Sequence, residues 1–364
     1  MKGKVKTFRI LLPFKKGDDK SVYAFQSHWD SESIKKAVLL SERKGKLPNF
    51  SLLRVEIHPG GSCSLNCGFC YGKKMAPKKR ENLAASAIEK ALGEISEKMP
   101  LENPLVVLSG FYSEPFTNPE IKRIIKAVGD NGFRIGIYTN GLLFDKEAAK
   151  IIVNAAEKAK NPLPSYVSFN ITASIQARYF AKLLKTIKLL AKARKNPQNL
   201  LINAPISIDR LSRKEISIWK KRIRLLKTAG ADYARLSVPW EKISPVKSKK
   251  KPAKIDFEIL EEIAGKFKNV HVRKGEPTSP HNKCYAMAMA MNISPEGLVF
   301  PCPEMSTTLR KEFSYGSILK ESITEIWHGK KHEKLFQKTI PKLKNCQCFP
   351  TNDQFNSLCE SFRK

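Results

Sequence analysis

Segments typical of β-strands alternate with segments typical of α-helices from residue 52 to residue 239. Residues 104–110 (PLVVLSG) exemplify the short, apolar strands, and residues 119–132 (PEIKRIIKAVGDNG) exemplify the helices, with a proline at the start and Asn-Gly at the end. Apolar strands joined to helices by short connections are typical of a parallel sheet covered by helices. Six such units are too few for a closed eight-stranded barrel. We therefore expect an α/β fold, either an open, partial (β/α)6 barrel or a doubly wound sheet.

The eight cysteines form two groups separated by a long stretch without cysteine. Three lie between residues 63 and 70, and five lie between residues 284 and 359. The first group follows the first predicted strand, 52–58, at the sheet edge where parallel α/β folds bind ligands. No apolar run follows the basic residues after Met1, so we expect no signal peptide and no disulfide framework. The cysteines are better candidates for metal ligands.

The sequence GGSCSLNCGFCYGKK (60–74) gathers three thiols on one short loop. Thiolates at this density indicate zinc or an iron–sulfur cluster. A structural zinc site needs four ligands, and the only nearby fourth ligand, His58, precedes the loop at the end of a strand. A 4Fe–4S cluster with Cys63, Cys67 and Cys70 as ligands would leave one iron open to a small molecule.

The spacing C-x3-C-x-aromatic-C, formed by Cys63, Cys67, Phe69 and Cys70, resembles that of the radical S-adenosylmethionine (SAM) superfamily. The resemblance implies that the amino and carboxylate groups of SAM chelate the open iron. It also implies that an electron from the cluster cleaves SAM to methionine and a 5′-deoxyadenosyl radical, which abstracts hydrogen from a substrate.

The same resemblance implies a set of SAM-binding residues after the next strands. The segment SGFYSEP (109–115) resembles the one that contacts the SAM amino group, with Ser113 in place of a usual glycine and with Glu114 as the acid that pairs with the ammonium. Relatives bind the ribose or carboxylate of SAM at positions similar to Ser168, Asn170 and Asn203. Each of these three residues could instead cap a strand or turn.

The C-terminal cysteines resemble a second cluster site. Cys284 and Cys302 frame the pattern C-x12-G-x4-C, which is similar to the start of the SPASM and twitch modules that hold auxiliary 4Fe–4S clusters. Cys346, Cys348 and Cys359 complete five candidate ligands, of which four would bind one cluster. Structural zinc at the same residues is the alternative. Residues 284–302 read as two strands joined at a Pro-Glu-Gly turn, with Met287, Met289 and Met291 on one strand face.

These observations divide the chain into four parts. We expect an N-terminal extension of unknown role at 1–50, a radical SAM partial barrel at 51–244, a basic linker and bridging segment at 245–283, and a SPASM/twitch-like domain of a β-hairpin plus helix at 284–364.

The chain is strongly basic, with 66 Lys+Arg against 34 Asp+Glu and a formal charge of +32. Such a field attracts anionic partners, so an anionic or polar small molecule, an acidic peptide or a nucleic acid fits the charge. A general bias toward lysine explains the charge equally well. No apolar run approaches the roughly 18 residues needed to span a bilayer, so we expect a cytoplasmic protein without a membrane partner.

The function expected first is that of a radical SAM enzyme with two 4Fe–4S clusters, acting on a small polar substrate of the sugar or nucleoside type. It would oxidise, rearrange or cross-link that substrate, with an electron donor such as flavodoxin or ferredoxin. One alternative is a radical maturase of a ribosomally made peptide or a modifier of RNA. Another is a non-catalytic iron–sulfur or zinc protein that binds nucleic acid. No catalytic acid or base can be named from the sequence.

Overall fold

The structure is a computed structural model of the whole chain. It describes residues 8–10, 25–27, 31–67, 70, 80–99, 104–110, 113–160, 163–172, 175–208, 213–238, 257–273, 281, 283–339 and 350–363. Three of the predicted site residues, Phe69, Cys346 and Cys348, lie outside these ranges.

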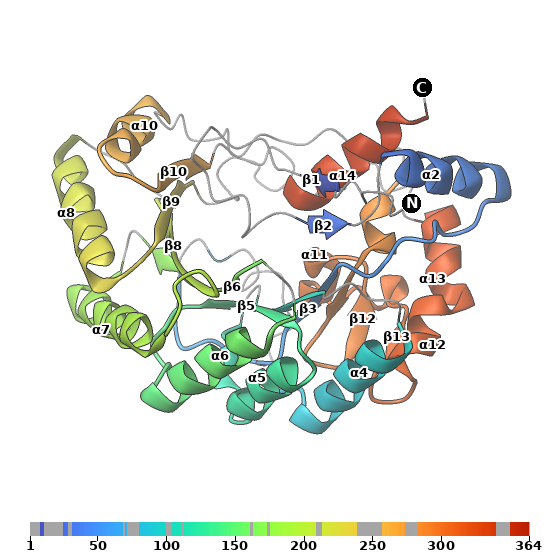
Figure 1. Cartoon of the computed structure of the whole chain (residues 1–364), viewed down its shortest axis with the longest axis horizontal. Helices are drawn as coiled ribbons and strands as arrows, with labels where there is room; N and C mark the ends of the chain where they lie inside the picture. Colours follow the sequence, from blue (N-terminus) through green and yellow to red (C-terminus); the bar gives the residue numbers. More distant parts are fainter. Residues whose placement is uncertain are drawn as a thin grey trace, which may run out of the picture.

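Seven parallel strands form the main part of a curved sheet, and neighbours in the sheet follow one another in sequence. They are β3 (Arg54–Ile57), β4 (Leu105–Leu108), β5 (Arg134–Thr139), β6 (Ser165–Phe169), β8 (Leu200–Ser207), β9 (Tyr233–Ser237) and β10 (Val270–Arg273). The short β7 (Ile171–Thr172) also pairs with β8. The sheet does not close on itself (Figure 1). The open, partial barrel expected from the sequence is therefore confirmed, with β10 added inside the range predicted as a basic linker.

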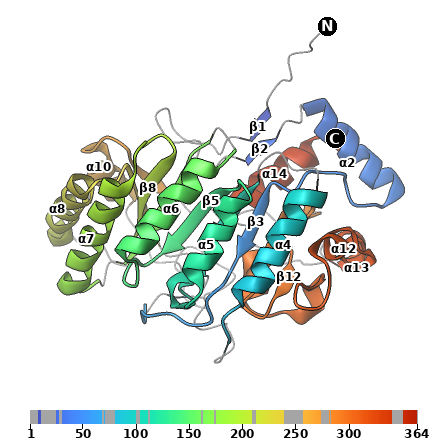
Figure 2. The ribbon, with the colours of Figure 1, turned by 60° about the horizontal axis from the view of Figure 1, so that its bottom comes forward.

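Helices cover the convex side of this sheet. They are α4 (Ala85–Lys98), α5 (Ile121–Asp130), α6 (Lys146–Lys158), α7 (Ala177–Ala193), α8 (Arg213–Ala229) and α10 (Phe257–Gly265). Figures 1 and 2 show α4 to α8 side by side along the outside of the strands. Each helix presents an apolar stripe to the sheet, as Ile88, Leu92 and Ile95 of α4 do, and this stripe is buried.

The two faces of the sheet differ in polarity, because successive side chains of a strand point to opposite faces. The convex face joins the apolar core shared with the helices, through Val55, Val106, Ile135, Val167, Ile202, Ala234 and Val270. The alternate positions carry many polar side chains, namely Glu56, Tyr138, Tyr166, Ser168, Asn203, Tyr233, Arg235 and His271. The concave face is thus unlike the apolar interior of a closed barrel.

The C-terminal module continues the same sheet. β11 (Ala290–Ile293) pairs parallel with β3, and β12 (Leu298–Phe300) and β13 (Gly316–Ser317) follow it as antiparallel neighbours. Gly297 makes the predicted turn between β11 and β12 with φ +73°. Around these strands lie η2 (Tyr285–Ala288), α11 (Pro303–Thr307), η3 (Lys311–Phe313), α12 (Ile323–His328), α13 (Lys330–Lys334), η4 (Leu335–Thr339) and α14 (Pro350–Ser361).

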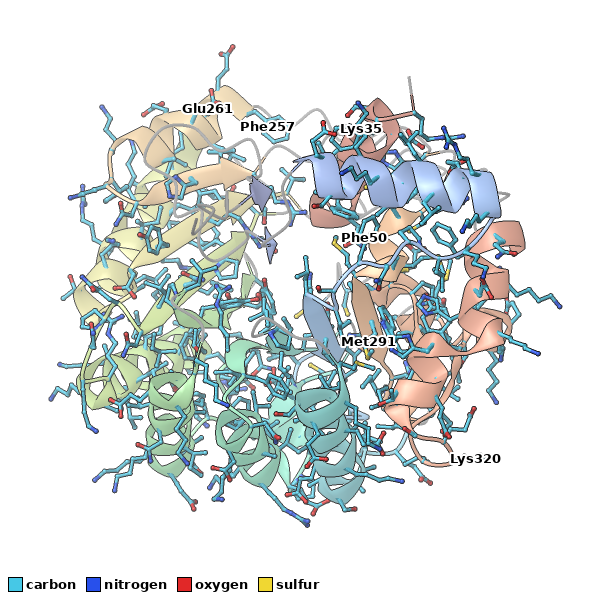
Figure 3. The ribbon with its side chains drawn as sticks, turned by 45° about the vertical axis from the view of Figure 1, so that its right-hand side comes forward. Lys35, Phe50, Phe257, Glu261, Met291 and Lys320 are labelled. Carbon is cyan, nitrogen blue, oxygen red and sulfur yellow. The ribbon has the colours of Figure 1, made fainter. Side chains whose placement is uncertain are left out.

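The expected methionine face of the first hairpin strand is wrong. Residues 285–288 form the 3-10 helix η2, and the strand begins only at Ala290, so Met287, Met289 and Met291 do not share one strand face. All three are fully buried instead, and Figure 3 shows Met291 inside the module, between the sheet and the C-terminal helices. Alternation of Ala and Met fits a buried 3-10 turn as well as a strand.

The N-terminal part contributes two elements before the barrel. β1 (Phe8–Ile10) and β2 (Phe25–Ser27) form a separate antiparallel pair, and α2 (Ser31–Lys44) contacts α14. The ring of Phe50 packs edge-on against Phe355 of α14, with centroids 5.4 Å apart (Figure 3). None of the described helices is both long enough and apolar enough to cross a membrane.

Candidate functional site

The two ends of the cysteine loop are held together by one buried side chain. Asn118, which is 1 % exposed, donates from Nδ2 to the carbonyl oxygens of Pro59 at 2.9 Å and Leu83 at 2.8 Å. Leu83 also donates its backbone N–H to Pro59 at 3.0 Å. The loop therefore starts and ends at a fixed point beside β3, although it contains more than twenty residues.

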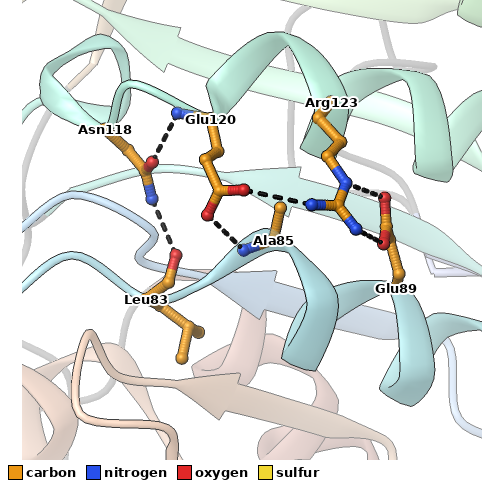
Figure 4. A network of polar contacts seen from close by, with 6 residues as sticks. All are labelled: Leu83, Ala85, Glu89, Asn118, Glu120 and Arg123. Atoms are coloured by element: carbon orange, nitrogen blue, oxygen red, sulfur yellow. Dashed lines mark hydrogen bonds and ion pairs between the residues drawn. The ribbon is translucent and has the colours of Figure 1, made fainter.

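Further contacts continue this network into α4 and α5 (Figure 4). Ala84, at the N-terminus of α4, makes no capping hydrogen bond, and the carboxylate of Glu120 accepts the free N–H of Ala85 at 3.0 Å. Arg123 pairs through two nitrogens with Glu89, at 2.7 and 2.5 Å. The end of the loop is thus tied to the helix that follows β4.

The start of the loop passes against two other backbone segments. A Cβ on Gly60 would lie 2.4 Å from the carbonyl oxygen of Glu114, and one on Gly61 would lie 2.3 Å from that of Arg80. Only glycine allows such an approach. Glu114 also donates its N–H to the carbonyl oxygen of Ser62 at 2.7 Å. This brings the predicted SAM-binding segment directly against the cysteine loop.

Among the described cysteines, only Cys63 of this loop is exposed. Cys67 and Cys70 are half-buried. A backbone hydrogen bond from Cys70 N to the Cys67 carbonyl oxygen, at 3.1 Å, closes a turn between two of them. Asn140 Nδ2 donates to Ser64 Oγ at 3.0 Å and lies 3.9 Å from Cys63 Sγ, so the turn after β5 helps to hold the loop.

The loop supplies three thiol donors, and thiolates are the ligands of iron–sulfur clusters. A zinc ion needs its ligand atoms about 2.3 Å from one centre, whereas a 4Fe–4S cluster bonds each thiolate to a different iron. Partial burial of the sulfur raises the pKa of Cys63, and the nearby Glu114 and Cys70 add to this, so a cationic partner is needed to favour the thiolate.

Glu114, predicted to pair with the SAM ammonium, is buried at the carboxyl end of the sheet. Its carboxylate accepts hydrogen bonds from Thr139 Oγ1 at 2.5 Å, Asn140 N at 2.8 Å and Phe116 N at 3.4 Å. Burial nevertheless raises the pKa of Glu114 to about 7, since no cation among the described residues lies beside it. Thr139, at the end of β5, and Asn140 after it therefore orient this carboxylate.

Two further predicted SAM-binding residues carry buried polar atoms without a partner. Ser113 Oγ and Asn203 Oδ1 make no hydrogen bond within the described part of the chain, although both residues are buried. Asn203 Nδ2 lies 3.5 Å from Ser168 Oγ, so β6 and β8 bring these two side chains together. Buried polar atoms of this kind are rare in folded proteins, and a polar ligand would satisfy them. Asn170 is exposed after β6, and its N–H donates to the Thr139 carbonyl oxygen at 2.7 Å.

A charged network that the sequence analysis missed lies under the cysteine loop. Glu56 of β3 pairs with Arg54 and accepts a hydrogen bond from Ser109 Oγ at 2.6 Å, and its carboxylate lies 3.4 Å from His58 Nε2. Burial alone would raise the pKa of Glu56, but the Arg54 guanidinium and the contacts from His58 and Ser109 lower it to about 2. The alternation of Arg and Glu in RVEI (54–57) was the available signal, since charge inside a short strand requires a partner.

The described C-terminal cysteines lie in a packed interior. Cys284 and Cys302 are half-buried and Cys359 is buried. Asn356 of α14 links two parts of this group, because its Oδ1 accepts the N–H of Ala286 at 2.9 Å and its Nδ2 lies 3.9 Å from Cys284 Sγ. Burial raises the pKa of Cys359, as expected for a thiol among apolar side chains.

Arg80 joins the end of the first cysteine loop to the C-terminal module. Its guanidinium is 1 % exposed and pairs through two nitrogens with Glu296, at 2.5 and 2.7 Å. It also donates to the carbonyl oxygens of Thr307 at 3.0 Å and Ser306 at 3.1 Å, in the helix that follows Cys302. His58 Nδ1 lies 3.4 Å from Ser306 Oγ. Arg80 and His58, which lie on either side of the first cysteine loop, thus hold α11, the helix that directly follows the predicted ligand Cys302.

Comparison with known protein families assigns both parts of this arrangement. The family model described as the radical SAM superfamily matches residues 57–203, from the end of β3 to β8. A second model, described as the SPASM iron–sulfur cluster-binding domain, matches residues 284–349. These two domains imply SAM and 4Fe–4S clusters as cofactors.

Among curated proteins, the chain is similar to the antilisterial bacteriocin subtilosin biosynthesis protein AlbA of Bacillus subtilis, at 23% identity over 313 residues. The match covers 82% of this chain and 64% of AlbA, so it spans less than two thirds of that relative.

Among solved structures, SuiB of Streptococcus suis bound to its precursor peptide SuiA matches with a TM-score of 0.59 and 17% identity, covering 90% of this chain and 79% of SuiB. The protein anSMEcpe, with bound SAM and a peptide, matches with a TM-score of 0.54 and 14% identity, over 83% of this chain and 88% of that one. At these identities the two structures show a shared fold.

The fold, the three-cysteine loop after β3 and the two family matches lead to one assignment, which confirms the resemblance seen in the sequence. Residues 57–203 form a radical SAM domain, residues 284–349 form a SPASM iron–sulfur cluster-binding domain, and the chain belongs to the radical SAM superfamily of enzymes.

Proposed function

We propose that this chain is a radical SAM maturase that modifies a ribosomally made peptide. The observation that carries the proposal is the similarity over most of the chain to a bacteriocin biosynthesis protein, joined by the fold shared with SuiB, which was solved with a precursor peptide bound. The small sugar or nucleoside substrate expected first from the sequence has less support, and the peptide alternative replaces it.

In this proposal, Cys63, Cys67 and Cys70 bind the first cluster, which supplies the electron that cleaves SAM when both are bound. Glu114 accepts a hydrogen bond from the SAM amino group, because this buried carboxylate has three hydrogen bonds and no cationic partner among the described residues. Ser113, Ser168 and Asn203 donate to or accept from the polar groups of SAM, which would satisfy the two buried atoms that lack partners. Asn170 lies just after β6 at this edge of the sheet, and Phe69, which lies outside the described residues, stays a predicted SAM-binding residue.

The polar concave face offers a surface for a peptide rather than for an apolar ligand. Tyr233, Arg235 and His271 line its β9 and β10 part, and the rings of Tyr233 and His271 stack at 6.2 Å. The net charge of +32 favours an acidic peptide, since the field attracts anions before contact. Four of the five C-terminal cysteines would hold the auxiliary cluster. That cluster would accept the electron that a peptide radical loses when it is oxidised to the product.

The test uses anaerobically reconstituted protein with SAM, dithionite and the short peptides encoded beside its gene. We expect 5′-deoxyadenosine to form, and one of the peptides to lose the mass of two hydrogen atoms for each new bond. Cys63→Ala is the matched control, because it removes one ligand of the first cluster. SAM cleavage without any peptide product would reject the peptide substrate while keeping the enzyme class. No SAM cleavage by a loaded protein would reject the enzyme itself.

A further inference from the structure

The hydroxyl group of Tyr315 is buried in the C-terminal module without a hydrogen-bond partner. Tyr315 is 3 % exposed, and its hydroxyl oxygen is shielded from solvent and unpaired in the part of the chain that the structure describes. A tyrosine that only fills a core position gains nothing from a buried hydroxyl, because desolvating it costs free energy unless it finds a partner. The group therefore indicates a partner that the described part of the chain does not provide.

Tyr315 lies between the segments that carry two predicted cluster ligands. Its backbone N–H donates to the Val299 carbonyl oxygen at 2.8 Å, which places it beside the strand that leads to Cys302. The thiols of Cys284 and Cys302 lie near enough to its phenol to act on it electrostatically.

The ring of Tyr315 is held in one orientation by His332. The two rings stack with centroids 4.0 Å apart and an angle of 29° between them. His332 is itself fixed, because its ring nitrogens lie 2.7 Å from the Trp327 carbonyl oxygen and 3.0 Å from that of Met287. Met287 belongs to the 3-10 helix that directly follows Cys284. The residue that helps to fix His332 and the predicted ligand Cys284 therefore lie on one short segment.

We propose that the Tyr315 hydroxyl donates a hydrogen bond to a sulfur of the auxiliary cluster and thereby raises the reduction potential of that cluster. This inference rests on the proposed ligand role of Cys284 and Cys302. Reduction adds negative charge to the cluster, and a donor at sulfur stabilises the more negative state, so the bond favours the reduced form. Tyr315 is then a tuning residue rather than a catalytic one.

The test is a potentiometric titration of the holoenzyme, followed by electron paramagnetic resonance, with Tyr315→Phe as the variant. We expect the ratio of reduced to oxidised auxiliary cluster to fall about tenfold at a fixed ambient potential, a shift of about 59 mV for one electron. The potential of the three-cysteine cluster should not change. A loaded auxiliary cluster with an unchanged potential overturns the inference. A wild-type protein with only one cluster overturns the proposed auxiliary site as well.

Tyr285→Phe is the matched control. Tyr285 is fully buried and next to Cys284 in sequence, but its hydroxyl donates to Glu42 Oε1 at 2.5 Å. Its removal should leave both potentials unchanged. If Tyr315→Phe does not load a cluster, 3,5-difluorotyrosine at position 315 decides the question. This residue keeps the shape of tyrosine and donates a stronger hydrogen bond, so the potential should rise. No rise would overturn the inference.

Discussion

The two cysteine sites of this chain are built in opposite ways. The first lies on a loop with one exposed and two half-buried thiols, and it is fixed by Asn118 at its ends, by the close approach of Gly60 and Gly61 to other backbone at its start, and by Asn140 across from it. The second has half-buried and buried thiols in an aromatic interior that includes Tyr315 and Trp327. A site that admits a ligand cannot be enclosed, so its flanks must fix it, whereas a closed site is fixed by packing.

The largest expected effect separates the two sites by function. Cys63→Ala should abolish SAM cleavage, because the first cluster loses one of only three thiolates. Cys302→Ala should keep SAM cleavage but lower the iron content by about four per chain and stop product formation. The measurements are 5′-deoxyadenosine by chromatography and iron by colorimetric assay. Equal loss of SAM cleavage in both variants would contradict the assignment of SAM cleavage to the open first site alone.

A second prediction tests how strongly the buried Arg80–Glu296 pair, which joins the first cysteine loop to the C-terminal module, stabilises the protein. Arg80→Gln should destabilise the protein by about 3 kcal/mol, because it leaves Glu296 and two carbonyl oxygens without the buried guanidinium. Chemical denaturation of the apo protein gives the free energy of unfolding. Arg123→Gln is the control, since Arg123 has the same two-nitrogen geometry to Glu89 but is half exposed. It should change the stability little. Equal losses of unfolding free energy in the two variants would show that burial does not decide how much such an ion pair stabilises the protein.

A third prediction concerns the ends of the open loop. Asn118→Leu keeps the branched shape of the side chain but removes the hydrogen bonds to Pro59 and Leu83 and the one from Glu120 N, so we expect a loss of about 2 kcal/mol in unfolding free energy. The thiols should also react faster with an alkylating reagent, because the loop is no longer closed. Asn131→Leu, which removes one bond to Ala127 on a partly exposed helix end, should leave that reaction rate unchanged. An unaltered rate in Asn118→Leu would mean that other contacts close the loop.

The smallest expected effect is a pH dependence of SAM binding at the first site. The raised pKa of Glu114, about 7, leaves the carboxyl mostly protonated at pH 6 and half ionised at pH 7. Because the ionised carboxylate is the acceptor for the SAM amino group, affinity should increase about fivefold from pH 6 to pH 7. Calorimetry on the oxidised holoenzyme measures it. Glu114→Gln should bind more weakly and without this slope, and a slope that persists there would assign the titration to another group.

Features of the fold that depend on residues close together in the chain could be predicted from the sequence. The alternation of strands and helices gave the open parallel sheet, and cysteine spacing gave the superfamily, because both depend on neighbours in the chain. The first of the two strands predicted within residues 284–302 was wrong at its start, where residues 285–288 form a 3-10 helix, since alternating small and large apolar residues fit a buried 3-10 turn equally well.

The supports of the first site could not be predicted in the same way. Arg80 meets Glu296 across 216 positions, and Asn118 meets Pro59 across 59, so no local signal connects them. The ligand roles of the cysteines and of the SAM-binding residues stay predictions until the measurements above are made.

The parallel pairing of β3 with β11 has a consequence for how the chain is made. His58, at the entry to the cysteine loop, donates its N–H to the Ile293 carbonyl oxygen at 2.9 Å, and Val55 pairs with Met291. During translation, the ribosome releases the cysteine loop and the helices α4 to α10 before it has made β11. Until then one edge of β3 exposes unpaired amides and carbonyls. Cells that express this protein must therefore keep a nascent chain with free thiols and an open sheet edge from aggregating or oxidising until its last third has been synthesised.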